Sequence, residues 1–329
     1  MTSLLQLDDL SLQFTIGTLD IPVVRGVDLS ISKGEIVGLV GESGCGKSVT
    51  CLAAMGLLDD NAKLGGQVRW KDRVIEPTHD ASMSALRGNE MAMIFQDPMT
   101  ALNPVKRIGK QLIEAIRINN TSRLRKSELR ARAIELLRDV GVPEPETCLS
   151  AYPHQLSGGL SQRVMIAMML AGDPELLIAD EPTTALDVTV QAQIMDLLQN
   201  LRDKRDMSVI LVTHDLGVVA GVCDRIFVMY CGRIIESGAV RDVFANPRHP
   251  YTCGLLASLP RVDQSEGGLS PVPGVVPLPT ELGLGCDFAA RCSRKQAQCE
   301  RETPALVALT NGTACACFNP NDQSEVQAQ

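Results

Sequence analysis

The strongest chemical signal in the sequence is a glycine-rich turn that ends in a lysine and a serine. Residues 41–48 read Gly-Glu-Ser-Gly-Cys-Gly-Lys-Ser and fit the pattern G-x-x-x-x-G-K-[ST]. Glycines let the backbone wrap closely, so that successive N–H groups point at phosphate oxygens, and the start of a helix adds partial positive charge. We expect Lys47 to contact the β- and γ-phosphates of a nucleotide and Ser48 to bind Mg²⁺. The alternative is a glycine-rich turn with an incidental lysine.

A second signal is a pair of carboxylates that follows a short apolar run. Residues 176–179 have the pattern of a buried strand, and Asp180 and Glu181 come directly after it. At the carboxyl end of a strand, Asp180 would hold Mg²⁺ and Glu181 would polarise an attacking water. A simple strand cap is the alternative, but a phosphate turn in the same chain favours the catalytic interpretation.

A third pattern is typical of a helix start that binds an anion. Residues 156–163 read Leu-Ser-Gly-Gly-Leu-Ser-Gln-Arg, in which Ser157 and two glycines would leave backbone N–H groups exposed. An ordinary helix cap is the alternative. Because the chain already has a complete phosphate cradle, a second anion site suggests a composite site that two subunits share.

Strand and helix patterns alternate along most of the chain and must position these residues. We predict strands at residues 36–40, 91–95, 176–179 and 209–213, and helices at residues 47–57, 159–171 and 190–204. This alternation predicts a mainly parallel sheet with helices packed on it. Residues 104–150 have helical apolar spacing with charged outer faces, so we expect a helical insertion at about 100–170.

Composition narrows the class of protein. The chain has 329 residues, 45 % of them apolar, which is enough for a folded core. Its net charge of −8 and aromatic content of 3 % argue against a dedicated nucleic-acid binder. No apolar run reaches the length of about 18 residues that a membrane span needs. The N-terminal residues lack the basic region of a signal peptide, so we expect a cytosolic chain that could contact a membrane protein from the inside.

Cysteine is unusually concentrated near one end. Five of the eleven cysteines lie at positions 286–317, and an odd total argues against a disulfide framework. The first three are spaced C-x₅-C-x₆-C, which is not the CxxC spacing of a zinc finger. Soft thiolates on a loop-rich segment suit a [4Fe–4S] cluster or a structural metal such as zinc, and free structural cysteines are the remaining alternative.

Taken in order, these motifs resemble those of the ATP-binding-cassette (ABC) family over about residues 4–260. Residues 41–48 resemble the Walker A motif, residues 156–163 the signature motif, and residues 176–182 Walker B. The resemblance also assigns Gln96 to the Q-loop, Asp187 to the D-loop (residues 185–187), His214 to the switch position and Phe14 to the adenine-stacking position.

The resemblance implies a set of nucleotide contacts. Glu181 would be the catalytic base, Gln96 would contact Mg²⁺ and water, and His214 would sense the γ-phosphate. The implied ATP contacts are Phe14, Gly41, Ser43, Gly44, Cys45, Gly46, Lys47, Ser48, Val49, Gln96 and Asp180, with Mg²⁺ held by Ser48, Gln96 and Asp180. In a head-to-tail dimer the partner's nucleotide would meet Ser157, Gly158, Gly159 and Gln162.

The implied fold is an α/β P-loop NTPase. We expect an ABC ATPase domain at residues 1–260, with a RecA-like core, an antiparallel β subdomain and an α-helical subdomain at about 97–170. A small Cys-rich extension would follow at residues 261–329. Residues 246–252, Asn-Pro-Arg-His-Pro-Tyr-Thr, and this extension resemble the ATPases of bacterial dipeptide, oligopeptide and nickel importers.

The importer resemblance implies a partner set and a location. The partners would be a second ABC ATPase, two transmembrane permeases and a periplasmic or surface substrate-binding protein, at the cytoplasmic face of the inner membrane. We expect an ATPase that energises peptide uptake, with nickel chelates or opines as alternative cargo. An exporter ATPase, or a soluble ABC protein acting on nucleic acid or ribosomes, is a weaker alternative, since the chain has one cassette and a negative charge.

The same resemblance selects ligands among the clustered cysteines. Relatives of this type include members with an iron–sulfur cluster in the extension. The ligands would be Cys286, Cys292, Cys299 and Cys317, with Cys315 as the alternative fourth ligand.

Overall fold

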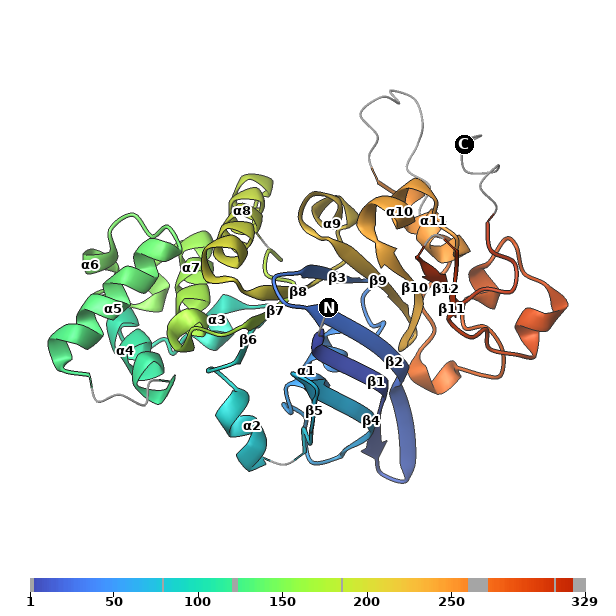
Figure 1. The fold of residues 1–329 in the computed structure, drawn as a ribbon, viewed down its shortest axis with the longest axis horizontal. Coiled ribbons are helices and arrows are strands. Elements are labelled where there is room, and N and C mark those ends of the chain that lie inside the picture. The colour runs from blue at the N-terminus through green and yellow to red at the C-terminus, as the bar shows by residue number, and fades with distance from the viewer. Residues whose placement is uncertain are drawn as a thin grey trace. The chain divides into compact units, whose positions relative to one another are not determined.

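The computed structural model describes residues 3–78, 80–119, 124–184, 186–259, 272–310 and 312–321. The chain divides into two compact units. Unit 1 comprises residues 32–35 and 79–212 with the first two residues, and unit 2 comprises residues 3–31, 36–78 and 213–329. Figure 1 labels the helices and strands of both units.

Unit 2 contains a four-stranded antiparallel sheet in the order β2-β1-β4-β5. Its strands are β1 (Ser3–Ile16), β2 (Leu19–Ser32), β4 (Ala62–Trp70) and β5 (Arg73–Ile75). In β1, Leu5, Leu7, Leu10 and Leu12 are buried while several of the intervening polar residues are not. This alternation is the pattern of a sheet with one face on the core.

A second run of hydrogen-bonded strands in unit 2 has the order β11-β12-β10-β9-β3. Its strands are β3 (Ile36–Val40), β9 (Arg225–Tyr230), β10 (Arg233–Ala239), β11 (Val307–Ala308) and β12 (Ala314–Cys315). The pair β3 and β9 is parallel, as expected, whereas β10, β11 and β12 pair antiparallel. All five residues of β3 are buried, which explains their uninterrupted apolar run.

Short helices complete unit 2. They are α1 (Lys47–Ala54), α9 (Leu216–Val222), α10 (Val240–Ala245) and α11 (Pro250–Ala257), with the 3₁₀ turns η3 (Pro279–Glu281), η4 (Ala289–Arg291) and η5 (Ala297–Glu300). The C-terminal residues join this core through β12, which pairs with β10, and through Phe288, which packs against Tyr230 and Tyr251. The domain boundary at residue 260 lies in a stretch outside the described residues and stays a prediction.

Unit 1 holds three parallel strands in the order β8-β7-β6. These are β6 (Met91–Ile94), β7 (Leu176–Asp180) and β8 (Ser208–Thr213), whose last residue belongs to unit 2. The helices are α2 (Asp80–Leu86), α3 (Pro98–Ala101), α4 (Ile108–Asn119), α5 (Lys126–Asp139), α6 (Pro145–Cys148), η1 (Pro153–Gln155), α7 (Gly158–Met169), η2 (Leu170–Gly172) and α8 (Val188–Arg205). The predicted strands and helices of this region are therefore confirmed, with end shifts of a few residues.

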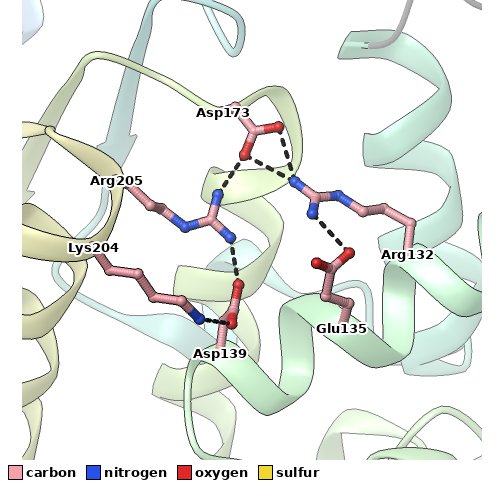
Figure 2. Close-up of polar contacts among 6 residues, drawn as sticks. All are labelled: Arg132, Glu135, Asp139, Asp173, Lys204 and Arg205. Carbon is pink, nitrogen blue, oxygen red and sulfur yellow. Dashed lines mark hydrogen bonds and ion pairs between the residues drawn. The ribbon is translucent and has the colours of Figure 1, made fainter.

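A network of charged side chains links α5, the end of η2 and the end of α8 in unit 1 (Figure 2). The Asp139 carboxylate accepts from Lys204 Nζ at 2.5 Å and from Arg205 Nη2 at 2.6 Å. Asp173 accepts from Arg205 and, with both oxygens at 2.8 Å, from Arg132. Burial would raise the pKa of Asp139, but the hydrogen bonds from Lys204 and Arg205 outweigh it, so that the pKa lies below its ordinary value.

Across the described segments, no helix combines the length and the apolar character needed to cross a membrane.

Candidate nucleotide-binding site

The glycine-rich turn connects β3 to α1 in unit 2, the strand–turn–helix context that the motif requires. A Cβ atom on Gly41 would lie 2.2 Å from the carbonyl oxygen of Met229, so no other residue fits there. Gly46, at φ 97°, is the N-cap of α1, a conformation that favours glycine. The two glycines thus shape a tight loop at the start of a helix.

Lys47 is buried within this loop. Its side chain is 5 % exposed, and its Nζ donates to the carbonyl oxygens of Gly41 at 2.8 Å and Glu42 at 3.0 Å. Ser43 and Gly44 are exposed, and Ser48 is half-buried. The ammonium is therefore held inside the loop, where it could reach a phosphate that entered the exposed side.

Cys45 is buried within the loop. The residue is 1 % exposed, and burial raises the pKa of the thiol. A buried, protonated thiol is a poor nucleophile, so Cys45 is poorly suited to redox chemistry.

The acidic strand end in unit 1 brings two predicted residues together. Glu181 follows β7 at φ 44°, and its N–H donates to the carbonyl oxygen of Val212 at 2.9 Å. Its Oε2 accepts from Gln96 Nε2 at 3.2 Å and from the Thr184 hydroxyl at 2.9 Å. Asp180, the last residue of β7, is 6 % exposed.

Thr184 is a site residue that the sequence reasoning missed. It lies three residues after Glu181, within the Glu-Pro-Thr-Thr segment, and no spacing rule pointed to it. The hydroxyl, together with the Gln96 amide, orients the carboxylate that we expect to act on water.

The signature segment begins α7 as predicted. Ser157 is the N-cap residue, with its hydroxyl accepting from Leu160 N–H at 3.4 Å, and Ser157 and Gly158 are exposed. Gln162, by contrast, is 1 % exposed and lies in the interior of unit 1. Its predicted role toward a partner's nucleotide stays a prediction.

The remaining single residues take separate positions. Asp187 caps α8 by accepting from Val190 N–H at 2.9 Å, while Ala185 of the predicted D-loop lies outside the described residues. His214 is exposed just before α9, and Phe14 is half-buried in β1. Gln96, Ser157, Asp180, Glu181 and Asp187 thus belong to unit 1, and the phosphate-binding loop and His214 belong to unit 2.

The cysteine-rich segment surrounds a small hollow in unit 2. Its lining includes all four predicted ligands, Cys286, Cys292, Cys299 and Cys317. Cys315 is instead buried in β12 and is not among the lining residues. Burial raises the pKa of Cys286 to about 11. In the described part of the chain, no three His, Cys, Asp or Glu side chains are arranged to hold a metal ion.

Comparison with known proteins identifies the family to which this fold belongs. Residues 24–184 match the ABC transporter family model, and residues 235–299 match the model of the oligopeptide/dipeptide transporter C-terminal region. The chain belongs to the ABC transporter family and is an ATP-binding subunit with ATPase activity.

Two relatives narrow the likeness to one branch of that family. The chain is 45 % identical to the oligopeptide transport ATP-binding protein AppD of Bacillus subtilis, over 100 % of both chains. It is 46 % identical to the dipeptide transport ATP-binding protein DppD of Escherichia coli, over 98 % of both.

A solved structure also resembles this one. The dimeric, post-hydrolysis state of the ATP-binding cassette MJ0796 bound to ADP and Pi has a TM-score of 0.65 and 28 % identity, covering 72 % of this chain and 99 % of that chain. The predicted α/β ABC fold is thereby confirmed.

Proposed function

We propose that this chain hydrolyses ATP to energise the uptake of dipeptides or oligopeptides by a multi-subunit importer of the bacterial inner membrane. The observation that carries the proposal is the likeness along the whole chain to subunits named for oligopeptide and dipeptide transport. The match of residues 235–299 to the transporter C-terminal region supports it independently of the cassette motifs. Nickel chelates or opines are the alternative cargo of the same transport machinery.

Separate groups of residues bind the phosphates and the Mg²⁺ ion. Backbone N–H groups of residues 41–48 and the Lys47 ammonium bind the β- and γ-phosphates. Ser48, Asp180 and Gln96 are the residues that would hold Mg²⁺, which neutralises phosphate charge when bound. Their oxygen donors fit that ion.

Glu181 acts as the general base toward the attacking water. The Gln96 amide and the Thr184 hydroxyl both donate to the same oxygen of this carboxylate and so fix its orientation, as a general base requires. His214 senses the γ-phosphate, and Phe14 stacks on the adenine.

A second ATPase subunit completes the site. The exposed N-terminus of α7, with Ser157, Gly158 and Gly159, faces the nucleotide of the partner, and Asp187 lies at the same interface. A dimeric state of the similar cassette MJ0796 supports this arrangement. The partner is a second ABC ATPase in a heterodimer, and the pair acts peripherally on two permeases at the cytoplasmic face of the membrane. A substrate-binding protein delivers the peptide.

Copurification tests the transport proposal. The full chain, tagged and extracted in mild detergent with its membranes, should retain permease subunits, and its ATP hydrolysis should rise when peptide-loaded binding protein is added. Recovery with ribosomal RNA or DNA instead of permeases would contradict the proposal.

We also propose that the cysteine hollow holds a [4Fe–4S] cluster on Cys286, Cys292, Cys299 and Cys317. Four cysteines around one hollow form the donor set that such clusters use. The absence of Cys315 from that lining supports Cys317 as the fourth ligand. The alternatives are zinc bound to the same thiolates and free cysteines. Iron analysis distinguishes both from the cluster.

A further inference from the structure

An ion pair joins the cysteine-rich segment to the phosphate-binding loop within unit 2. The Arg291 guanidinium donates to Glu42 with two parallel bonds, Nη1 to Oε2 at 2.7 Å and Nη2 to Oε1 at 3.0 Å. Its Nε donates to the carbonyl oxygen of Pro273 at 2.7 Å. The Arg291 side chain is 5 % exposed and that of Glu42 is 31 % exposed. This is a fixed, two-pronged contact rather than a mobile surface pair.

The backbone of Glu42 is hydrogen-bonded to a second residue, Tyr251. Its N–H donates to the Tyr251 hydroxyl at 2.8 Å, and Tyr251 is fully buried in α11. The carbonyl oxygen of Glu42 accepts from Lys47 Nζ at 3.0 Å. Glu42 thus connects Arg291 and Tyr251 directly to the lysine of the phosphate-binding loop.

The segment at residues 246–252 explains how Tyr251 reaches this position. Glu236, fully buried in β10, accepts the backbone N–H groups of Arg248 at 2.6 Å and His249 at 2.9 Å. The Nδ1 of His249 then accepts from the N–H of Tyr251 at 3.0 Å, which caps α11. Burial lowers the pKa of His249 to about 3, so the ring is neutral and able to accept. The contacts fix the start of the helix that carries Tyr251.

We propose that Arg291 and Tyr251 are positioning residues for the phosphate-binding loop, and that Arg291 also neutralises Glu42 beside the bound triphosphate. The inference rests on the proposed role of residues 41–48 in ATP binding. A carboxylate in this loop would repel the phosphates if it were unpaired, because like charges at short range raise the free energy. The guanidinium removes that repulsion and fixes the main chain whose carbonyl contacts Lys47.

The charge argument predicts a distinctive pattern among variants of the full chain. Arg291→Ala should raise the Kd for Mg-ATP by about tenfold, the loss expected for a hydrogen-bonded charge pair. Arg291→Lys keeps the charge but not the two-pronged geometry, so its Kd should lie between those of the original chain and Arg291→Ala. Glu42→Gln should change the Kd by less than about twofold, because Arg291 already neutralises this carboxylate in the original chain. Tyr251→Phe should weaken binding by about threefold, as loss of one neutral hydrogen bond does.

The double variant gives the decisive readout. Adding Glu42→Gln to Arg291→Ala should restore the Kd to within about twofold of the original, because the repelling carboxylate is gone. A purely structural role for Arg291 would not be rescued in this way. If Arg291→Ala fails to fold, Arg291→Lys with and without Glu42→Gln gives the same comparison. Equal Kd values for Arg291→Ala and the original chain, or effects of the two changes that simply add, would overturn the inference.

Two controls separate this inference from the proposed function. Lys295→Ala removes an exposed pair with Glu300 in the same segment and should leave the Kd unchanged. Lys47→Ala should abolish Mg-ATP binding. If Lys47→Ala binds normally, the proposed role of the loop fails; if it loses binding while Arg291→Ala does not, only the present inference fails.

Discussion

The side-chain amide of Gln96 donates to the carboxylate of Glu181 at 3.2 Å, across 85 residues of sequence. The contact exists because β6 and β7 are parallel neighbours, with Ile94 opposite Ala179, so that the residues following each strand emerge at the same edge. The Thr184 hydroxyl reaches the same carboxylate oxygen at 2.9 Å. These two contacts fix the orientation of the carboxylate, as a general base requires.

The first prediction concerns Glu181 itself. Glu181→Gln keeps the shape but removes the proton acceptor, so ATP turnover should fall by at least about 100-fold while Mg-ATP binding is retained. Phosphate release and nucleotide binding, measured on the same preparation, check both parts. Hydrolysis at the original rate would show that another group is the base.

Thr184 provides a prediction for a residue outside the known motifs. Thr184→Val removes the hydroxyl that orients Glu181 and should lower kcat by about tenfold, the effect of losing about 1.4 kcal/mol of positioning. The KM for ATP should stay unchanged, because the hydroxyl contacts the carboxylate rather than the phosphate-binding loop. Thr184→Ser is the matched control and should keep the rate. An increase in KM with unchanged kcat would assign Thr184 to binding instead.

The charged network of Figure 2 predicts a difference between two ion pairs of α5. Asp139 and Arg205 have side chains only 12 % and 14 % exposed, and Arg205→Ala would remove one of the two cations that bind Asp139 and one that binds Asp173, so it should cost about 2 kcal/mol of unfolding free energy. The Arg138–Glu146 pair is 64 % and 53 % exposed, and Arg138→Ala should cost less than about 0.5 kcal/mol. Urea unfolding of both variants measures the difference, and equal losses would contradict it.

The lowered pKa of Asp139 predicts an acid-sensitive contribution to stability. Because the pKa is lower in the folded than in the unfolded chain, the contribution is present above the ordinary carboxyl value of about 3.9 and is lost as the pH falls through the folded value. Asp139→Asn should therefore be less stable than the original at neutral pH, with the gap closing below about pH 4. Urea midpoints of the original chain and Asp139→Asn, measured across that pH range, check this prediction. A difference between the two midpoints that stays constant with pH would contradict it.

The cysteine hollow gives a prediction with a spectroscopic readout. Purified without oxygen, the full chain should be brown and contain about four irons. Cys317→Ser should lose iron and colour, whereas Cys315→Ser should keep both, since Cys315 lies in β12 outside the lining of the hollow. A colourless, iron-free original chain would remove the cluster, and zinc in its place would identify a structural metal site.

Much of the site follows from the sequence because its parts are contiguous. The phosphate-binding loop needs only a buried strand, glycines at the close approaches, and a helix that starts at Lys47, all within 36–54. Backbone sterics over such a short span decide the conformation, so residue types and spacing are sufficient. The same holds for Ser157 and Asp187, each of which caps the helix that follows it.

Only the tertiary structure decided which distant residues meet. Glu42 and Arg291 are 249 residues apart, and no periodicity links them; their contact depends on the packing of Phe288 against Tyr230 and Tyr251. The burial of Gln162 was likewise decided by the packing of α7, while its contact with a partner's nucleotide stays a prediction. Local patterns encode backbone shape, but long-range partners depend on how apolar faces combine, which spacing along the chain does not specify.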